Sequence, residues 1–261
     1  MEPVERDARG ILAPDVGLQH FRLTRHAPSE TVARFVDRYW VAEWDLPPGR
    51  TYPQQVLVHP VVNVVLTPGS GTSVSGVQRR RFTADLSGAG RVLGVMFRPG
   101  GFRPLLDGPV SRLTDRVLPL AEVLPGPAPA DDADNAEVDE WLAGLLPQGT
   151  HPCERTRDLV ERAAADRTLR RVDELAGLAG VTVRELQRDF ADHVGAPPKW
   201  VIRRYRLYEA AERAARGTDV RWAELAAELG YADQAHLVRD FTATVGMPPS
   251  RYAGLSRATS G

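Results

Sequence analysis

The sequence predicts an α+β protein in which a small, mainly-β domain is followed by an all-α domain. Segments 56–66, 72–86 and 91–99 are rich in β-branched residues and are separated by Pro and Gly turns, which is typical of strands. From about Glu154 onward, apolar residues recur at helical spacing instead. A single pattern occurs twice in this helical region, and short paired helices around a Gly turn are typical of helix-turn-helix units.

The composition is that of a globular protein with two domains. The chain has 261 residues, of which 43% are hydrophobic and 26% are charged. No apolar run approaches the ~18 residues of a membrane span, and the first residues lack the apolar core of a signal peptide. The single cysteine, Cys153, excludes an internal disulfide and a multi-cysteine zinc site. These observations favour a cytoplasmic protein without a membrane partner.

The charge is nearly balanced, with 33 Lys and Arg residues against 34 Asp and Glu residues. Residues 151–261 carry 18 basic and 16 acidic residues, whereas residues 1–150 carry 15 and 18. This asymmetry is too small for a broadly basic surface that attracts DNA in bulk. Any contact with DNA must therefore come from a few well-placed arginines.

The N-terminal domain is expected to span residues 1–124. Residues 21–44 have apolar side chains at three- and four-residue spacing, which predicts a helix. The three strand segments follow. Residues 100–124 are expected to form loops and short helical turns that close the β unit.

Residues 125–152 are expected to form a linker that carries one amphipathic helix. The linker begins with a stretch rich in Pro, Ala and Asp, and Asn135 and Pro147 are suited to begin and end the helix. Five apolar residues share one face of this helix: Val138, Trp141, Leu142, Leu145 and Leu146. This face either packs on the N-terminal domain or forms a homodimer contact through residues 135–146.

The repeat in the helical region relates residues 174–200 to residues 224–252. The two segments align first at an offset of 50 and, after one extra residue, at an offset of 51. The positions that are identical in both copies are, in the first copy, Glu174, Leu175, Ala176, Gly180, Leu186, Arg188, Asp189, Phe190, Val194, Gly195, Pro197 and Pro198. So many identities in two short windows indicate two copies of one structural unit.

Each copy has the residues that a helix-turn-helix needs. Gly180 and Gly230 suit the tight turn, and Thr182 with Glu185 forms a capping box for the second helix of the first copy. Asp233 suits the same N-cap position in the second copy. The apolar pairs expected to hold the second helices in their cores are Leu186 with Phe190, and Leu237 with Phe241. A Gly-x-Pro-Pro sequence then ends each helix.

The two units are joined by a predicted helix that begins at Pro197 and ends near Gly217. Some 20 residues at ~1.5 Å each give a rod of ~30 Å. Successive turns of the major groove lie ~34 Å apart. A rigid helix of this length therefore suits a chain that reads two adjacent turns of the groove.

The C-terminal segment, residues 153–257, resembles the DNA-binding domain of the AraC/XylS family of transcription regulators. The resemblance rests on LQRDF before VGAPPKWVIRRYRL, and on AELGYADQAHLVRDF before VGMPPSRY. It implies two recognition helices that enter consecutive major grooves of double-stranded DNA. It also implies RNA polymerase as a partner if the protein is an activator.

The resemblance also implies which side chains contact DNA. Those expected at base edges are Arg184, Gln187, Arg188, Gln234, His236 and Arg239. Those expected at phosphates are Thr182, Lys199, Arg203, Arg204, Asp233 and Arg251. Arginine can bond to guanine and glutamine to adenine, whereas phosphate contacts position the protein without reading sequence. Asp189 and Asp240 depart from the family pattern, and they either weaken the attraction to DNA or orient the neighbouring arginines.

The N-terminal half resembles the sensor domains of a subgroup of this family, on segments 56–66 and 94–120. This resemblance implies a cupin-like β-barrel that binds a small-molecule effector, and the same domain is a second candidate for a homodimer contact. The candidate pocket residues are Trp40, Trp44, Tyr52, His59, Asn63, Phe97 and Arg98. Because His20, His26 and His59 are scattered, no metal site and no cofactor is expected.

The leading interpretation is a non-enzymatic, sequence-specific transcription regulator that responds to a small molecule. The chain has no nucleophile motif of a hydrolase. One alternative is a regulator whose N-terminal domain mediates only protein contacts. Another is an alkyl-transfer DNA repair protein, although no motif of a reactive thiol surrounds Cys153.

Overall fold

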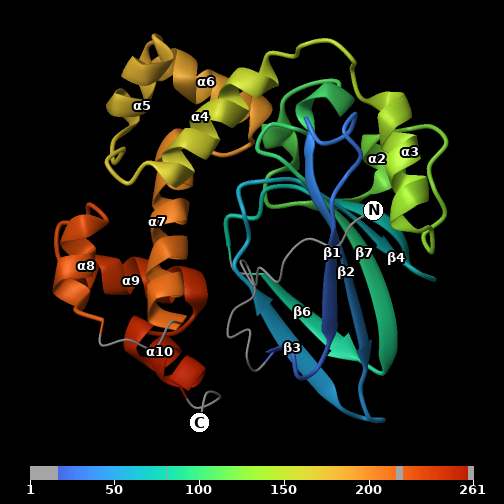
Figure 1. Cartoon of the computed structure of the whole chain (residues 1–261), viewed down its shortest axis with the longest axis horizontal. Coiled ribbons are helices and arrows are strands. Elements are labelled where there is room, and N and C mark those ends of the chain that lie inside the picture. Colours follow the sequence, from blue (N-terminus) through green and yellow to red (C-terminus); the bar gives the residue numbers. More distant parts are fainter. Residues whose placement is uncertain (1–16, 81, 216–219, 258–261) are drawn as a thin grey trace.

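The computed structural model describes residues 17–80, 82–215 and 220–257 (Figure 1). A mainly-β N-terminal unit lies beside an all-α C-terminal unit, which confirms the predicted fold class. The larger antiparallel sheet consists, in spatial order, of β1 (Arg22–His26), β2 (Val36–Asp45), β7 (Ala89–Phe97), β4 (Asn63–Thr67), β5 (Gly71–Ser75) and β8 (Val117–Pro119). A separate antiparallel ribbon consists of β3 (Thr51–Val56) and β6 (Phe82–Ser87).

The helix predicted over residues 21–44 is wrong, because this segment forms β1, a turn region and β2. The register between β2 and β7 shifts between Val36 and Arg38, as in a β-bulge with one extra residue. The buried side chains are therefore spaced three positions apart from Val36 to Tyr39 and two positions apart from Tyr39 to Val41. The bulge gives a strand the apolar spacing of a helix.

Two of the predicted strand segments are interrupted. The segment 56–66 holds the end of β3, a loop with Pro60, and most of β4. A proline cannot donate to a sheet ladder, which explains the break. The segment 72–86 likewise divides into β5 and β6.

The chain after β7 closes the N-terminal unit with short elements, as predicted for residues 100–124. These are the 3-10 helices η1 (Arg103–Leu105) and η2 (Val110–Leu113), the strand β8, and the helix α2 (Leu120–Val123). Val110, Leu113 and Leu120 lie in the same core as the larger sheet. This core is the main one of the N-terminal unit.

Helix α3 (Asn135–Leu145) packs on the N-terminal unit and is not a free linker element. Val138, Leu142 and Leu146 are buried in the main core, and of the five stripe residues only Leu145 is exposed. The N-cap is Asp134, one residue before the predicted position, and it forms a capping box with Glu137. The N-terminal unit therefore extends at least to Leu146.

A buried polar contact fastens α3 to β2. The hydroxyl of Tyr39 donates to Asp139 Oδ1 at 2.8 Å, and the backbone N–H of Ser29 donates to the same oxygen at 3.0 Å. Burial raises the pKa of Tyr39, which keeps its hydroxyl protonated as a donor. The apolar face of residues 135–146 therefore packs within the chain, which is the first of the two predicted alternatives for this helix.

The C-terminal unit is helical throughout its regular elements. These are α4 (Cys153–Ala165), α5 (Val172–Ala179), α6 (Val183–His193), α7 (Pro198–Ala215), α8 (Trp222–Glu228), α9 (Gln234–Val245) and α10 (Pro249–Arg257). Figure 1 shows α7 between two groups of shorter helices, with α4, α5 and α6 at one end and α8, α9 and α10 at the other. Among the residues that the structure describes, no helix is both long and apolar enough to span a bilayer.

The two groups have separate cores, which confirms the predicted pairs of apolar residues. Leu186 and Phe190 of α6 are buried in one core, and Leu237 and Phe241 of α9 in the other. Gly180 ends α5 in the left-handed conformation at φ 64°, as a C-cap glycine does. The repeated sequence thus gives two copies of one packed unit.

Candidate DNA interface

The first recognition helix, α6, presents its predicted base-contacting residues to solvent. Arg184, Gln187 and Arg188 are exposed, whereas Leu186 and Phe190 are buried on the other face. The predicted capping box begins this helix: the side chain of Thr182 accepts from the backbone N–H of Glu185, and the carboxylate of Glu185 accepts from the backbone N–H of Thr182. The polar face therefore stands on a well-defined helix start.

The second recognition helix, α9, presents Gln234 and Arg239 to solvent. His236 is half-buried, and its ring lies edge-on to Tyr231 at 5.1 Å between centroids. The carboxylate of Asp233 accepts from the backbone N–H of His236 at 2.7 Å, which confirms the predicted N-cap. Asp233 was also expected at a phosphate; because its carboxylate caps the helix, only its backbone N–H could donate to a phosphate there.

The two acidic residues beside the arginines behave differently. Asp189 lies 3.8 Å from the guanidinium of Arg188, whose side chain is still 74% exposed. Asp240 is instead paired with Arg203 of α7, whose Nε donates to Asp240 Oδ2 at 3.1 Å. The first acid can orient its neighbouring arginine, whereas the second ties α9 to α7.

Helix α7 sets the distance between the recognition helices. It has 18 residues, which at ~1.5 Å each span ~27 Å. This length approaches the ~34 Å between successive major-groove turns. Because α6 and α9 pack at opposite ends of α7 (Figure 1), one chain can present two reading helices to one side of a duplex.

The residues expected at phosphates are not all accessible. Thr182, Lys199, Arg203 and Arg251 are exposed, and Arg203 is also paired with Asp240. These four stay candidates for phosphate contact.

Arg204 is a correction, since its side chain is buried and cannot reach a phosphate. Its guanidinium lies 4.6 Å above the Trp200 ring and donates to the backbone carbonyl of Arg79 at 2.9 Å. Burial lowers the pKa of Arg204, which is the expected effect of removing a cation from water. The residue joins the two units of the chain and does not face solvent.

The predicted pocket residues do not gather in one place. A cavity of about 520 Å³ is lined by His20, Leu46, Pro47, Arg50, Thr51 and Tyr52. Of the seven candidates only Tyr52 lines it, with its ring 4.0 Å from that of His20. A volume of this size suits a small organic molecule.

Trp40 and Trp44 lie across the larger sheet instead. A methyl group added at Gly94 would collide with the indole of Trp40, and one at Gly90 would collide with that of Trp44. Each indole therefore covers a glycine of β7, and Trp40 Nε1 donates to Asn63 Oδ1 at 3.4 Å. Trp40, Trp44 and Asn63 thus share a half-buried part of the sheet outside the cavity.

The last three pocket candidates have structural contacts. Phe97 is fully buried and packs edge-on to Phe102. His59 stacks on Tyr208 of α7 at 4.4 Å, and Arg98 donates to Glu161 of α4 at 3.1 Å. Phe97 thus belongs to the core, and His59 and Arg98 belong to the junction between the units. None of the three lines the cavity beside Tyr52.

Several solved structures have a similar overall fold, among them structures of ToxT from Vibrio cholerae. One is 11% identical with a TM-score of 0.44 and covers 83% of this chain and 98% of that chain. ToxT with a bound unsaturated fatty acid is 13% identical with a TM-score of 0.42, covering 83% and 95%. ToxT bound to (E)-4-(8-methylnaphthalen-1-yl)but-3-enoic acid is 13% identical with a TM-score of 0.42, covering 91% and 99%. At these values no ligand and no residue role carries over.

Two family models match the chain directly. Residues 24–119 match a domain of unknown function, DUF6597, and residues 175–254 match a helix-turn-helix domain. Residues 175–254 are an AraC-type helix-turn-helix domain. The match covers both repeated units, from α5 into α10. A search of the curated proteins found no match.

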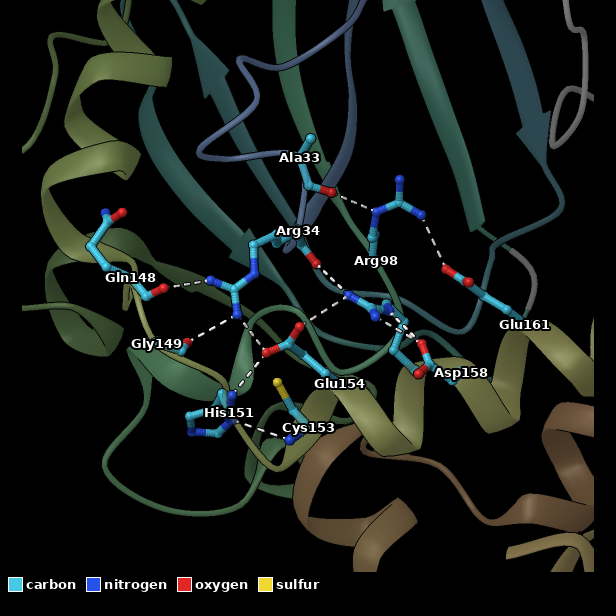
Figure 2. A network of polar contacts seen from close by, with 11 residues as sticks. Ala33, Arg34, Arg98, Gln148, Gly149, His151, Cys153, Glu154, Asp158 and Glu161 are labelled. Carbon is cyan, nitrogen blue, oxygen red and sulfur yellow. Dashed lines mark hydrogen bonds and ion pairs between the residues drawn. The ribbon is translucent and has the colours of Figure 1, made fainter.

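The AraC-type domain is joined to the N-terminal unit by a network of polar contacts (Figure 2). Arg34 donates to the carbonyls of Gln148 and Gly149 and to Glu154 Oε1 at 2.7–2.9 Å. Arg157 of α4 donates in return to the carbonyl of Arg34 at 3.0 Å. Sequence reasoning missed this junction, because no local pattern marks an arginine that bonds to residues more than a hundred positions away.

The only cysteine of the chain lies inside this junction. Cys153 is buried at the start of α4, and burial raises the pKa of its thiol to about 11. A thiol that accepts alkyl groups must be accessible and easily deprotonated, and Cys153 is neither. Over residues 17–80, 82–215 and 220–257, no three His, Cys, Asp or Glu side chains gather as a metal site would require.

Proposed function

We propose that the chain is a sequence-specific transcription regulator whose DNA binding responds to a small molecule held by the N-terminal unit. The observation that carries the proposal is the pair of capped recognition helices, α6 and α9, joined by α7, which is ~27 Å long. The exposed residues Arg188 and Arg239 lie at equivalent positions of the two copies, where each can reach base edges. Sensing is supported by the cavity beside Tyr52.

The reading of bases is tested with duplexes that the full chain selects from a random pool. Arg188→Ala and Arg239→Ala should each weaken binding by about 1–3 kcal/mol and relax the preference at one or two base pairs. Arg162→Ala is the matched control, because Arg162 is exposed on α4 and pairs only with nearby Asp166 in the contacts described. If both recognition variants keep the selectivity of the parent protein, the assigned contacts are wrong.

The sensing role is tested by thermal denaturation of the full chain in the presence of small hydrophobic and aromatic metabolites. A compound that binds the native state raises the melting temperature, and at 100 times its Kd it adds about 2.7 kcal/mol. Tyr52→Ala should reduce the shift if the compound binds in the cavity. No shift from any compound of a broad collection would favour an N-terminal unit that mediates only protein contacts.

Two further partners belong to the same proposal. Since α3 packs within the chain, self-association would use another surface of the N-terminal unit. RNA polymerase is the expected partner if the regulator activates transcription. Self-association is measured by sedimentation of the full chain with and without its selected duplex.

A further inference from the structure

The β3–β6 ribbon connects the cavity to the DNA-binding domain. At one end of the ribbon, Thr51 pairs with Ser87 and Tyr52 with Leu86, and Thr51 and Tyr52 line the cavity. At the other end, Val56 pairs with Phe82. The six residues of β3 are separated by five rises of ~3.4 Å, which place the two ends ~17 Å apart. In Figure 1, β3 runs from the lower edge of the N-terminal unit toward α7 and α9.

Two residues of the N-terminal unit, one of them at the far end of the ribbon, lie in the helix-turn-helix cores. Leu57 directly follows β3, is 2% exposed, and lies in the core of the second unit with Phe241. Val77 lies two residues after β5 of the larger sheet, and its carbonyl accepts from the backbone N–H of Asp115 at 3.0 Å. Val77 is 0% exposed and lies in the core of the first unit with Phe190. Residues of the N-terminal unit thus complete both cores of the DNA reader.

Polar and aromatic contacts hold the same end of the ribbon against α7. Tyr208 donates its hydroxyl to the carbonyl of Leu57, and His59 stacks on the Tyr208 ring at 4.4 Å. Burial raises the pKa of Tyr208 well above its ordinary value, so the hydroxyl stays a donor. Arg204, one helical turn before Tyr208, donates to the carbonyl of Arg79 at 2.9 Å. The contacts come from one face of α7, since residues four apart share a face.

The ribbon can move without breaking the larger sheet. Within the described residues, β3 and β6 pair with each other and with no strand of that sheet. The ribbon does pack on the larger sheet through side chains: Leu86 and Tyr52 lie in one cluster with Leu46 and Trp44, and Trp44 Nε1 donates to the carbonyl of Ser87 at 3.1 Å. A shift of the ribbon along its own axis therefore costs side-chain packing but breaks no ladder between the ribbon and the sheet. One end of the ribbon is at the cavity, and the other, at Leu57, is at the core of the second helix-turn-helix unit.

We propose that the β3–β6 ribbon is the mechanical link through which a ligand in the cavity alters the relative placement of the two recognition helices. The inference rests on the proposed function, because it takes the cavity as the effector site. A molecule against Tyr52 displaces the cavity end of the ribbon, and Leu57 then changes how it packs in the core of the second unit. Val77, which follows β5 and is bonded to Asp115, stays with the larger sheet and keeps its place in the core of the first unit. The second unit therefore shifts relative to the first, and this shift couples ligand binding to DNA binding.

Hydrogen exchange of the full chain tests this link without a known effector. Tyr52→Ala removes a side chain that lines the cavity, and it should speed exchange of the amides in 57–59, α8 and α9 about fivefold or more. Tyr52→Trp, which enlarges the side chain at the wall of the cavity, is the second variant and should change exchange in the same segments. Leu93→Ala is the control for general destabilisation: Leu93 is buried in the larger sheet, so its loss should speed exchange in β4 and β7 at least as much as in α8 and α9.

DNA binding gives the second arm of the test. Tyr52→Ala and Leu57→Ala are combined, and affinity for the selected duplex should differ at least about fivefold from the product of the single effects. Sites so far apart ordinarily act independently. A purely multiplicative result, or exchange that Tyr52→Ala speeds in β4 and β7 as much as in α8 and α9, overturns the link. A parent protein that selects no duplex contradicts the proposed function instead, while the exchange result still decides the link.

Discussion

Lys199 and Arg204 lie five residues apart on α7, and their surroundings give them opposite roles. Lys199 is exposed beside the first recognition helix, whereas Arg204 is buried between α7 and Arg79. Each phosphate contact adds about 0.9 to the slope of log affinity against log salt concentration. We expect Lys199→Gln to reduce this slope by about 0.9 and Arg204→Met to leave it unchanged. A reduced slope in Arg204→Met would show that Arg204 leaves its buried site to meet DNA.

His193, at the end of α6, is expected to make the stability of the junction depend on pH. Its Nδ1 lies 2.7 Å from the hydroxyl of Thr156, and burial, together with the nearby Arg103 cation, lowers its pKa. The unfolded chain, with a histidine pKa near ~6.5, then binds more protons than the native chain below that pH. The free energy of unfolding should therefore fall as the pH drops from 7 to 5. His193→Gln should reduce this fall in urea titrations at the two pH values, and an unchanged fall would exclude His193 as a source.

At the scale of elements, both recognition helices depend on a single N-cap side chain. Thr182 and Asp233 each accept from the backbone N–H three residues on, and loss of such a cap costs about 0.5–2 kcal/mol. We expect Thr182→Ala and Asp233→Ala each to lower the free energy of unfolding by about 1 kcal/mol. Thr182→Asp keeps an acceptor and should retain most of the stability. Equal losses in Thr182→Ala and Thr182→Asp would mean that the cap contributes little.

The helical half could be predicted in detail because its signals are local. Gly180 needs the left-handed conformation, Thr182 and Glu185 cap each other, and Phe190 lies one turn beyond Leu186, all within a dozen residues. The N-terminal half could not, because a bulge at Asp37 changes the apolar spacing of β2 and makes it resemble a helix. Contacts across the chain, such as that of Arg204 with Arg79, have no local signal at all. They depend on which loops the fold brings to α7.

At the scale of the whole molecule, the N-terminal unit and the DNA reader share their packing. Val77 and Leu57 of the first belong to the two cores of the second. Ion pairs cross the same junction, with Arg34 to Glu154 at 2.7 Å and Arg103 to Asp192 at 2.8 Å. Neither helix-turn-helix core is complete without the N-terminal unit. Because the N-terminal unit supplies part of each helix-turn-helix core, it also fixes where the DNA reader lies relative to it. A regulator whose DNA binding depends on a ligand requires such a connection.

This shared packing predicts one cooperative unfolding transition for the full chain in calorimetry. Arg34→Met removes donors to two exposed carbonyls and to the partly buried Glu154, and should lower the free energy of unfolding by about 1 kcal/mol or more. Arg162→Met is the matched control: its pair with Asp166 is exposed and four residues apart, so its loss should cost at most about 0.5 kcal/mol. Two separate transitions, or equal losses in the two variants, would show that the junction does not join the units into one cooperative body. In a single transition, destabilisation at Arg34 lowers the melting temperature of the recognition helices as well, because they cannot unfold apart from the unit that completes their cores.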